Sequence, residues 1–135
     1  MAQSATGEPT QVTLSVPAQS AYVSVLRTTA AGLAARLDFT VDDIEDLRIA
    51  VGEASALLLP IADTGTTTVP TLDATFVLGQ ARLDVELVVP SPPAVSVDTD
   101  SFAWQVLSTL SESCEVRTAD RTTTLVLGAR STLLD

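Results

Sequence analysis

The sequence predicts an α/β fold, a two-layer sandwich in which helices cover one face of a β-sheet. Segments with apolar residues at every second position alternate with segments in which apolar residues recur every three or four positions. Their order along the chain is β-α-α-β-β-α-β-β, and two long helices before a meander of strands suit this layering. The 135 residues, of which 46% are apolar, suit a single domain with an aliphatic core.

The first half of the chain predicts one strand and two helices. Residues 1–10 are polar and are expected to be disordered, and residues 11–16 alternate as a strand does. Residues 18–37 predict a helix, and Thr40 predicts the N-cap of a second helix that Pro60 ends. The expected core stripe of the first helix is Tyr22, Leu26, Ala30, Leu33 and Leu37. That of the second helix is Ile44, Leu47, Val51, Ala54 and Leu58.

The second half begins with a hairpin. Residues 63–67 are rich in turn-forming residues and are expected to link the second helix to it. Residues 72–78 and 83–89 both alternate, and Gly79-Gln80 predicts the tight turn between them. Residues 90–100 hold three prolines and predict a loop.

A third helix and a second hairpin complete the predicted fold. Residues 101–112 carry the apolar residues Phe102, Val106, Leu107 and Leu110 at helical spacing. Residues 114–118 and 123–127 predict the closing hairpin. One domain is therefore expected over residues 11–130, followed by a short tail at 131–135.

The composition excludes several kinds of chemistry. The chain has no His, Lys or Asn, and all seven basic residues are Arg. It therefore lacks an imidazole base, a His-ligated metal site, a Schiff-base lysine and a Walker A lysine. One Cys forms no intrachain disulfide or zinc cluster, and no two of the six glycines lie closer than 13 residues, so a GxGxxG loop is absent. The net charge of −10 disfavours nucleic acid.

The sequence also indicates where the protein acts. The first 11 residues have no apolar segment typical of a secretory signal, and the apolar run before Pro60 is too short to span a bilayer. Cys114, the single cysteine, fits a reducing compartment and is expected to be buried in a strand. A cytoplasmic location is therefore expected. The use of Arg in place of Lys, with abundant Ala, suggests a GC-rich source genome.

The second predicted helix carries a motif. Residues 44–55 read IEDLRIAVGEAS, and the positions that matter are Asp46, Ala50, Val51, Glu53 and Ala54. Arg27 stands 26 residues before Glu53 on the preceding helix. With the element order, this pattern resembles the bacterial anti-sigma regulatory factor family (the RsbW/SpoIIAB group), whose members have the GHKL ATPase/kinase fold. Residues 101–110 resemble mycobacterial members of the UsfX type. The resemblance covers most of residues 11–128 and implies a mixed sheet covered on one face by about three helices.

Three positions that the family uses for Mg·ATP differ in this chain. Where the family has a Mg²⁺-binding Asn, four residues after the glutamate, this chain has Leu57. The family's adenine-reading Asp and its glycines follow the central hairpin, where this chain has a proline-rich segment beginning at Pro90. The Gly-rich phosphate turn before the third helix is replaced by a segment with Asp98 and Asp100. No cofactor and no metal are therefore expected, with ATP and Mg²⁺ as the alternative.

Three residues are candidates for function. The resemblance implies that Glu53 matches the general base that deprotonates a target serine, and beside Leu57 we interpret it as a relict of that base, or simply a solvated helix acid. It also implies that Arg27 faces a partner, a role that suits the rigid fork of donors of an arginine, against the alternative of an ordinary surface residue. Trp104, the only tryptophan, marks either a contact surface or a half-buried packing position.

The resemblance implies a regulatory binding protein. It would sequester an alternative sigma factor of the stress or sporulation type, form a homodimer, and be antagonised by an anti-anti-sigma protein of the STAS type. The acidic run at residues 38–46 and the net charge of −10 suit a basic protein partner, or else merely a solvated helix start. No nucleic acid and no membrane are expected as partners. One alternative is an active ATP-dependent serine kinase that phosphorylates the anti-anti-sigma protein through Glu53, and another is a degenerate domain that binds a different regulator.

Overall fold

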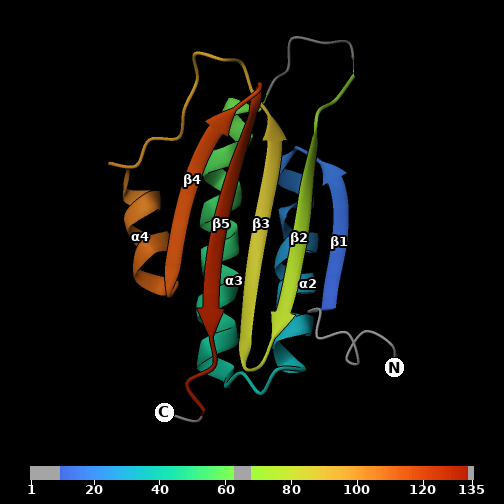
Figure 1. The fold of residues 1–135 in the computed structure, drawn as a ribbon, viewed down its shortest axis with the longest axis vertical. Coiled ribbons are helices and arrows are strands. Elements are labelled where there is room, and N and C mark those ends of the chain that lie inside the picture. The colour runs from blue at the N-terminus through green and yellow to red at the C-terminus, as the bar shows by residue number, and fades with distance from the viewer. Residues whose placement is uncertain (1–9, 63–67, 134–135) are drawn as a thin grey trace.

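A five-stranded β-sheet with helices packed on one face forms the protein (Figure 1). The computed structural model describes residues 10–62 and 68–133, so most of the segment expected to be disordered and the expected link at 63–67 lie outside the described residues. The predicted fold class and the order β-α-α-β-β-α-β-β are confirmed. The sheet has the order β1-β2-β3-β5-β4 and every pair is antiparallel, so the expectation of a mixed sheet is wrong.

The strands alternate as the sequence predicts. They are β1 Thr10–Pro17, β2 Thr71–Gly79, β3 Arg82–Pro90, β4 Ser113–Ala119 and β5 Thr122–Arg130. Alternate residues of the three central strands point to the helices and are fully shielded from solvent, among them Phe76, Leu83, Val85, Leu87, Leu125 and Leu127. This face of the sheet is the main part of the hydrophobic core.

Both hairpin turns contain residues with positive φ. The β2–β3 turn consists of Gln80 and Ala81, one residue later than predicted, because Gly79 still pairs with Arg82 in the ladder. Ala81 has a φ of 54°. In the β4–β5 turn, Asp120 and Arg121 have φ values of 54° and 62°, as the twist of a two-residue hairpin requires.

Helix α2 (Val23–Ala35) is shorter than the predicted 18–37. A 3-10 turn, η1 (Ser20–Tyr22), precedes it, and this turn leaves Tyr22 39% exposed, so its expected core position is wrong. Leu26 and Ala30 of the expected stripe are buried, and Leu33 and Leu37 are half-buried. The helix ends before Asp38, whose φ of 62° turns the chain toward α3.

Helix α3 (Val41–Leu58) begins at the predicted cap. The hydroxyl of Thr40 accepts from the Asp43 N–H and the Asp43 carboxylate accepts from the Thr40 N–H, both at 3.0 Å. Four of the five stripe residues are buried and Ile44 is half-buried. A second 3-10 turn, η2 (Leu59–Ile61), extends past the predicted end, with Pro60 in its first turn.

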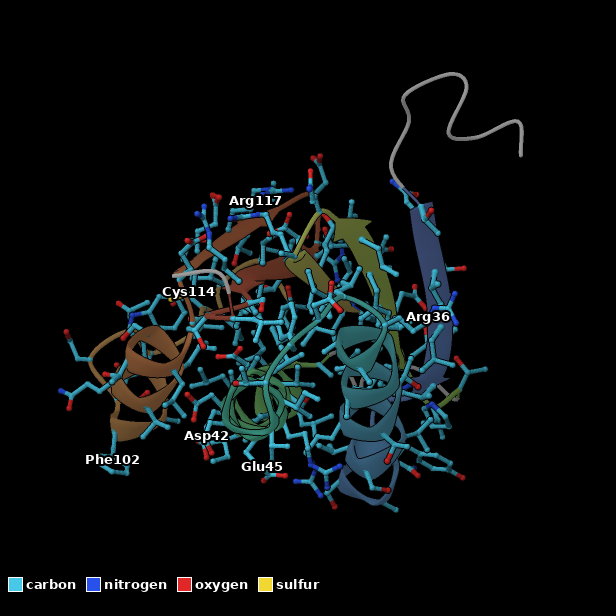
Figure 2. The ribbon with its side chains drawn as sticks, turned by 90° about the horizontal axis from the view of Figure 1, so that it is seen from below. Arg36, Asp42, Glu45, Phe102, Cys114 and Arg117 are labelled. Atoms are coloured by element: carbon cyan, nitrogen blue, oxygen red, sulfur yellow. The ribbon has the colours of Figure 1, made fainter. Side chains whose placement is uncertain are left out.

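Helix α4 (Phe102–Leu110) lies beside α3, on the side opposite α2 (Figure 2). Ser101 caps it by accepting the Trp104 N–H at 3.2 Å. Leu107 is buried, but Phe102 is 79% exposed, so its expected core position is wrong. Phe102 lies about 140° around the helix from Leu107, which turns its ring to solvent.

Residues 131–133, which belong to the expected tail at 131–135, are bonded to the domain, and residues 134–135 lie outside the described residues. Ser131 is buried, its hydroxyl donates to the Asp38 carbonyl at 2.6 Å, and its N–H donates to the Ala81 carbonyl at 2.9 Å. Thr132 bonds to Asp43 on α3. In the described parts of the chain, no helix has both the length and the apolar character that crossing a bilayer requires.

Candidate functional site

Arg27 is a residue of helix α2, and its side chain contacts Gly52 of the motif on helix α3. A Cβ atom on Gly52 would stand 3.4 Å from both the Cδ and the Nη1 atoms of Arg27, so the arginine side chain packs on this glycine. Arg27 is half-buried, and within residues 10–62 and 68–133 it has neither an ion pair nor a hydrogen bond. Its donors are therefore available for another molecule.

Glu53 and Leu57 follow on the same helix. Both side chains are half-buried, and they share one row of α3 because they are four residues apart. Leu57 packs against the hydrophobic core. At the position where the resemblance implies a metal ligand, the chain therefore has a hydrocarbon side chain that contributes to packing.

The loop after β3 is anchored to the sheet. Ser91 is buried, its Oγ lies 2.8 Å from the Oγ1 of Thr123, and its N–H donates to the Arg121 carbonyl at 2.9 Å. Further along, Val95 packs against the core and Val97 is buried. Pro90, at the end of β3, is half-buried and pairs with β5. The polar groups of Ser91 thus bond within the protein.

Acidic residues precede helix α4. Asp98 is exposed, its carboxylate accepts the Asp100 N–H at 2.9 Å, and its carbonyl accepts the Ser101 hydroxyl at 2.8 Å. Trp104 is half-buried and packs against the core, so its expected half-buried position is confirmed. Any contact of Trp104 with a partner stays a prediction.

Leu57, Asp98 and Asp100 do not fit the binding of Mg·ATP. Leu57 supplies no oxygen for the metal, which prefers carboxylate, carbonyl and water ligands. Asp98 and Asp100 carry negative charge at the turn where the resemblance implies a phosphate-binding loop, which would need hydrogen-bond donors. Over the described residues, no three His, Cys, Asp or Glu side chains are grouped so that they could hold a metal ion.

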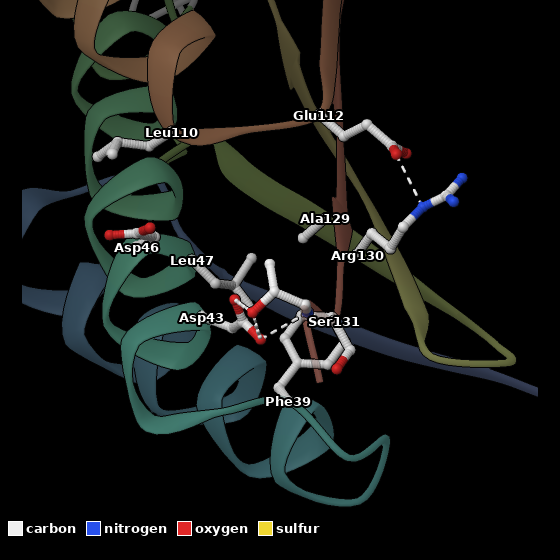
Figure 3. Close-up of a pocket in the computed structure, with 10 residues that line it drawn as sticks. Phe39, Asp43, Asp46, Leu47, Leu110, Glu112, Ala129, Arg130 and Ser131 are labelled. Carbon is white, nitrogen blue, oxygen red and sulfur yellow. Dashed lines mark hydrogen bonds and ion pairs between the residues drawn. The ribbon is translucent and has the colours of Figure 1, made fainter. Parts of the chain in front are cut away.

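A pocket of about 230 Å³ lies near the other end of α3 (Figure 3). Its apolar wall consists of Phe39, Leu47, Leu110 and Ala129. Its polar wall consists of Asp43, Asp46, Glu112, Arg130, Ser131 and Thr132. The sequence did not predict this pocket, because residues from α3, the α4–β4 connection and the end of β5 come together only in the fold.

Ion pairs and hydrogen bonds hold the charges of this pocket in place. Glu112 pairs with Arg82, and also with the Nε of Arg130 at 2.8 Å. Burial by itself would raise the pKa of Asp43, but hydrogen bonds from Thr132 and Thr40 outweigh it and lower that pKa. Cys114 on β4 is half-buried, although the sequence led us to expect it to be buried, and this partial burial raises the pKa of its thiol.

The fold matches that of a known domain. The crystal structure of the RsbU and RsbW domains of Rv1364c from Mycobacterium tuberculosis aligns with a TM-score of 0.64, over 90% of this chain and 32% of that chain, at 14% identity. The protein is therefore an α/β domain with the GHKL-type fold of RsbW.

Sequence relatives specify the resemblance further. The serine-protein kinase RsbW of Halalkalibacterium halodurans is 36% identical over 96 residues, which are 70% of this chain and 55% of that protein. The protein of the same name from Bacillus cereus strain B4264 is 33% identical over 99 residues, 71% of this chain and 57% of that protein. This chain is a relative of RsbW, as its motif predicted, although no protein-family model matches it. It spans about half the length of these curated relatives.

Proposed function

We propose that this protein is an anti-sigma regulator that binds an alternative sigma factor and keeps it from acting. The similarity to RsbW supports the class of function. The observation that carries the proposal is Arg27, which lies on Gly52 of the motif with its guanidinium unpaired within the described residues. Arginine is enriched among the residues that dominate binding energy at interfaces.

The proposed contact surface extends from Arg27 over α3. Ile49, one turn before Gly52, is 45% exposed and offers an apolar contact beside the arginine. Glu45 and Arg48 form an exposed pair on the same helix, with Nε and Oε2 atoms 3.9 Å apart. An apolar centre with charged surroundings is the usual arrangement of an interface. We propose that a STAS anti-anti-sigma protein competes for this surface in the cytoplasm, and that the regulator acts as a homodimer.

We further propose that binding takes place without kinase chemistry. Leu57 packs against the core where a Mg²⁺ ligand would be required, and the anchored Ser91 has its hydroxyl bonded to Thr123. Phosphoryl transfer depends on metal ions and donors that neutralise the phosphates. Glu53 on its own does not supply these.

A binding measurement tests the proposal. The purified protein is titrated by calorimetry with each alternative sigma factor and each STAS protein of the source organism. We expect one sigma factor to bind at micromolar concentration or below, with Arg27→Ala weakening it about tenfold, or ~1.4 kcal/mol. Arg36→Ala is the matched control, because Arg36 is exposed at the end of α2. The absence of any sigma or STAS partner at this concentration contradicts the proposal.

The second candidate function is a serine kinase that phosphorylates the anti-anti-sigma protein. It is favoured by the name of the relatives and by Glu53, which keeps the place of a general base. Calorimetry with Mg·ATP separates the two functions. Micromolar binding of Mg·ATP, with phosphate transfer lost in Glu53→Gln, would establish the kinase and overturn the proposal of binding alone.

A further inference from the structure

An apolar stripe runs along the outer side of helix α4. Phe102, Val106 and Leu110 are spaced four residues apart and line a surface hollow of about 270 Å³ together with Gln105 and Thr109. We call Phe102, Val106 and Leu110 the α4 stripe. Phe102 is 79% exposed, and Figure 2 shows it pointing outward from α4, away from the sheet. Val106 and Leu110 are half-buried, and Leu110 also packs against the core, so the stripe is most exposed at Phe102. A contiguous apolar patch that reaches the surface marks an interaction surface more often than an isolated apolar residue.

Both ends of the α4 stripe are acidic. Leu110 also lines the pocket described above, so the stripe leads directly to its acids. Glu112 is paired there with Arg82 and Arg130, whereas Asp43 and Asp46 have no ion pair within the described residues. At the other end, the exposed Asp98 and Asp100 precede Phe102 by four and two residues. From Phe102 to Leu110 the helix rises about 12 Å, so the two acidic groups flank a short apolar segment.

From this arrangement we infer that the α4 stripe is a docking site for a basic amphipathic helix of another protein. An apolar row on that helix would cover Phe102, Val106 and Leu110, as in helix-in-groove recognition. Arginine or lysine residues at its two ends would meet the acids at the two ends of the stripe. Charge complementarity of this kind selects the partner and speeds association.

The negative charges of the protein argue against two other occupants of the α4 stripe, a second copy of this chain and an anionic lipid surface. If two copies paired through the stripe about a two-fold axis, the acidic ends of one copy would face the acidic ends of the other. The net charge of −10 repels an anionic lipid surface. The site also differs from the one around Arg27, because α4 and α2 lie on opposite flanks of α3 (Figure 2). The inference therefore does not depend on the proposed binding of a sigma factor.

Trp104 makes the inference testable in the intact protein. It is the only tryptophan and lies on α4, so its fluorescence reports on this helix. The probe is a synthetic helical peptide of about 18 residues, long enough to hold a helix, without Trp, with Leu every four residues and Arg at both ends. A twin peptide has Glu in place of every Arg.

We expect the basic peptide to change the Trp104 fluorescence saturably, and the acidic twin to bind at least about tenfold more weakly. Phe102→Ala should weaken the basic peptide about tenfold and leave the circular dichroism unchanged, because the ring is exposed. The matched control is Val69→Ala, which removes a 55% exposed apolar side chain before β2 and should leave binding unchanged.

Three results would overturn the inference. The first is no binding of the basic peptide at about millimolar concentration, and the second is equal binding by the acidic twin or by Phe102→Ala. The third is a protein dimer in sedimentation equilibrium that Phe102→Ala dissociates, since the stripe would then be an interface between two copies.

Discussion

The carboxylate of Asp43 joins the start of helix α3 to the end of the described chain. It accepts the Thr132 N–H and the Thr132 hydroxyl, both at 2.9 Å, although 89 residues separate the two in sequence. The same carboxylate completes the capping box with Thr40. One side chain thus satisfies donors of the helix N-terminus and also holds the segment after β5 against the domain.

Replacement of Asp43 by Ala should therefore destabilise the protein. Loss of a cap typically costs about 1 kcal/mol, and the loss of the bonds to Thr132 brings the expected decrease in the free energy of unfolding to about 2 kcal/mol. Asp42→Ala is the control, because Asp42 is exposed in the same helical turn, and it should cost about 0.5 kcal/mol. Urea unfolding of both variants measures the difference, and equal effects would show that the Thr132 contacts contribute nothing.

The lowered pKa of Asp43 gives a dependence on pH. A carboxyl whose folded pKa lies below its unfolded value stabilises the protein above the unfolded value, which is 3.8 for Asp, and this stabilisation is lost as the pH falls through the folded pKa. Wild type should therefore be more stable than Asp43→Asn by a constant amount above about pH 5, and the difference should shrink below about pH 4. A difference that grows on acidification would contradict this assignment.

Two phenylalanines should respond differently to truncation. Phe76 is fully buried on β2, so Phe76→Ala should lower the free energy of unfolding by about 3–5 kcal/mol through lost transfer energy and a cavity. Phe102 is 79% exposed, so Phe102→Ala should change it by less than about 0.5 kcal/mol. Thermal unfolding of the two variants checks this, and a large loss in Phe102→Ala would mean that the ring is covered in solution.

Restoring an asparagine at position 57 should not restore nucleotide binding. Leu57 packs against the core, so Leu57→Asn should cost about 1–3 kcal/mol of stability, because a polar amide replaces apolar contacts. The acids Asp98 and Asp100 remain before α4. Calorimetry of this variant with Mg·ATP should show no heat of binding at about millimolar nucleotide. Micromolar binding would mean that one residue alone separates this protein from a kinase.

Two glycines should respond in opposite directions to Ala. A Cβ on Gly128 would stand 2.7 Å from the Ser113 Oγ and 2.9 Å from both Arg82 Nη2 and Asp84 Oδ1. Gly128→Ala should therefore displace this ion pair and cost about 1 kcal/mol. Gly32 lies exposed in α2 with nothing within 4 Å of such a Cβ, so Gly32→Ala should stabilise the helix by about 0.5–1 kcal/mol. Denaturant midpoints compare the two, and a stabilised Gly128→Ala would show that the network adjusts without cost.

Part of the candidate site around α3 could be predicted from the sequence, because a motif on one helix depends only on residue type and spacing. The motif on α3 and its spacing to Arg27 predicted the similarity to RsbW, which the sequence relatives confirm. That Leu57 stands in place of a metal ligand stays a prediction. The packing of Arg27 on Gly52 could not be predicted from the sequence, because it depends on how α2 packs against α3. The acid-lined pocket could not be predicted either, because its walls come from segments far apart in the chain.

The sequence by itself determined the order of the elements, the inward face of each central strand and the capping box at Thr40, because periodicity and capping act over a few residues. Only the tertiary structure decided that Tyr22 and Phe102 are exposed and that Thr132 is bound to Asp43. An apolar residue at helical spacing is buried only when another element covers it, and a hydrogen bond across 89 residues forms only after the sheet and helices have brought its two ends together.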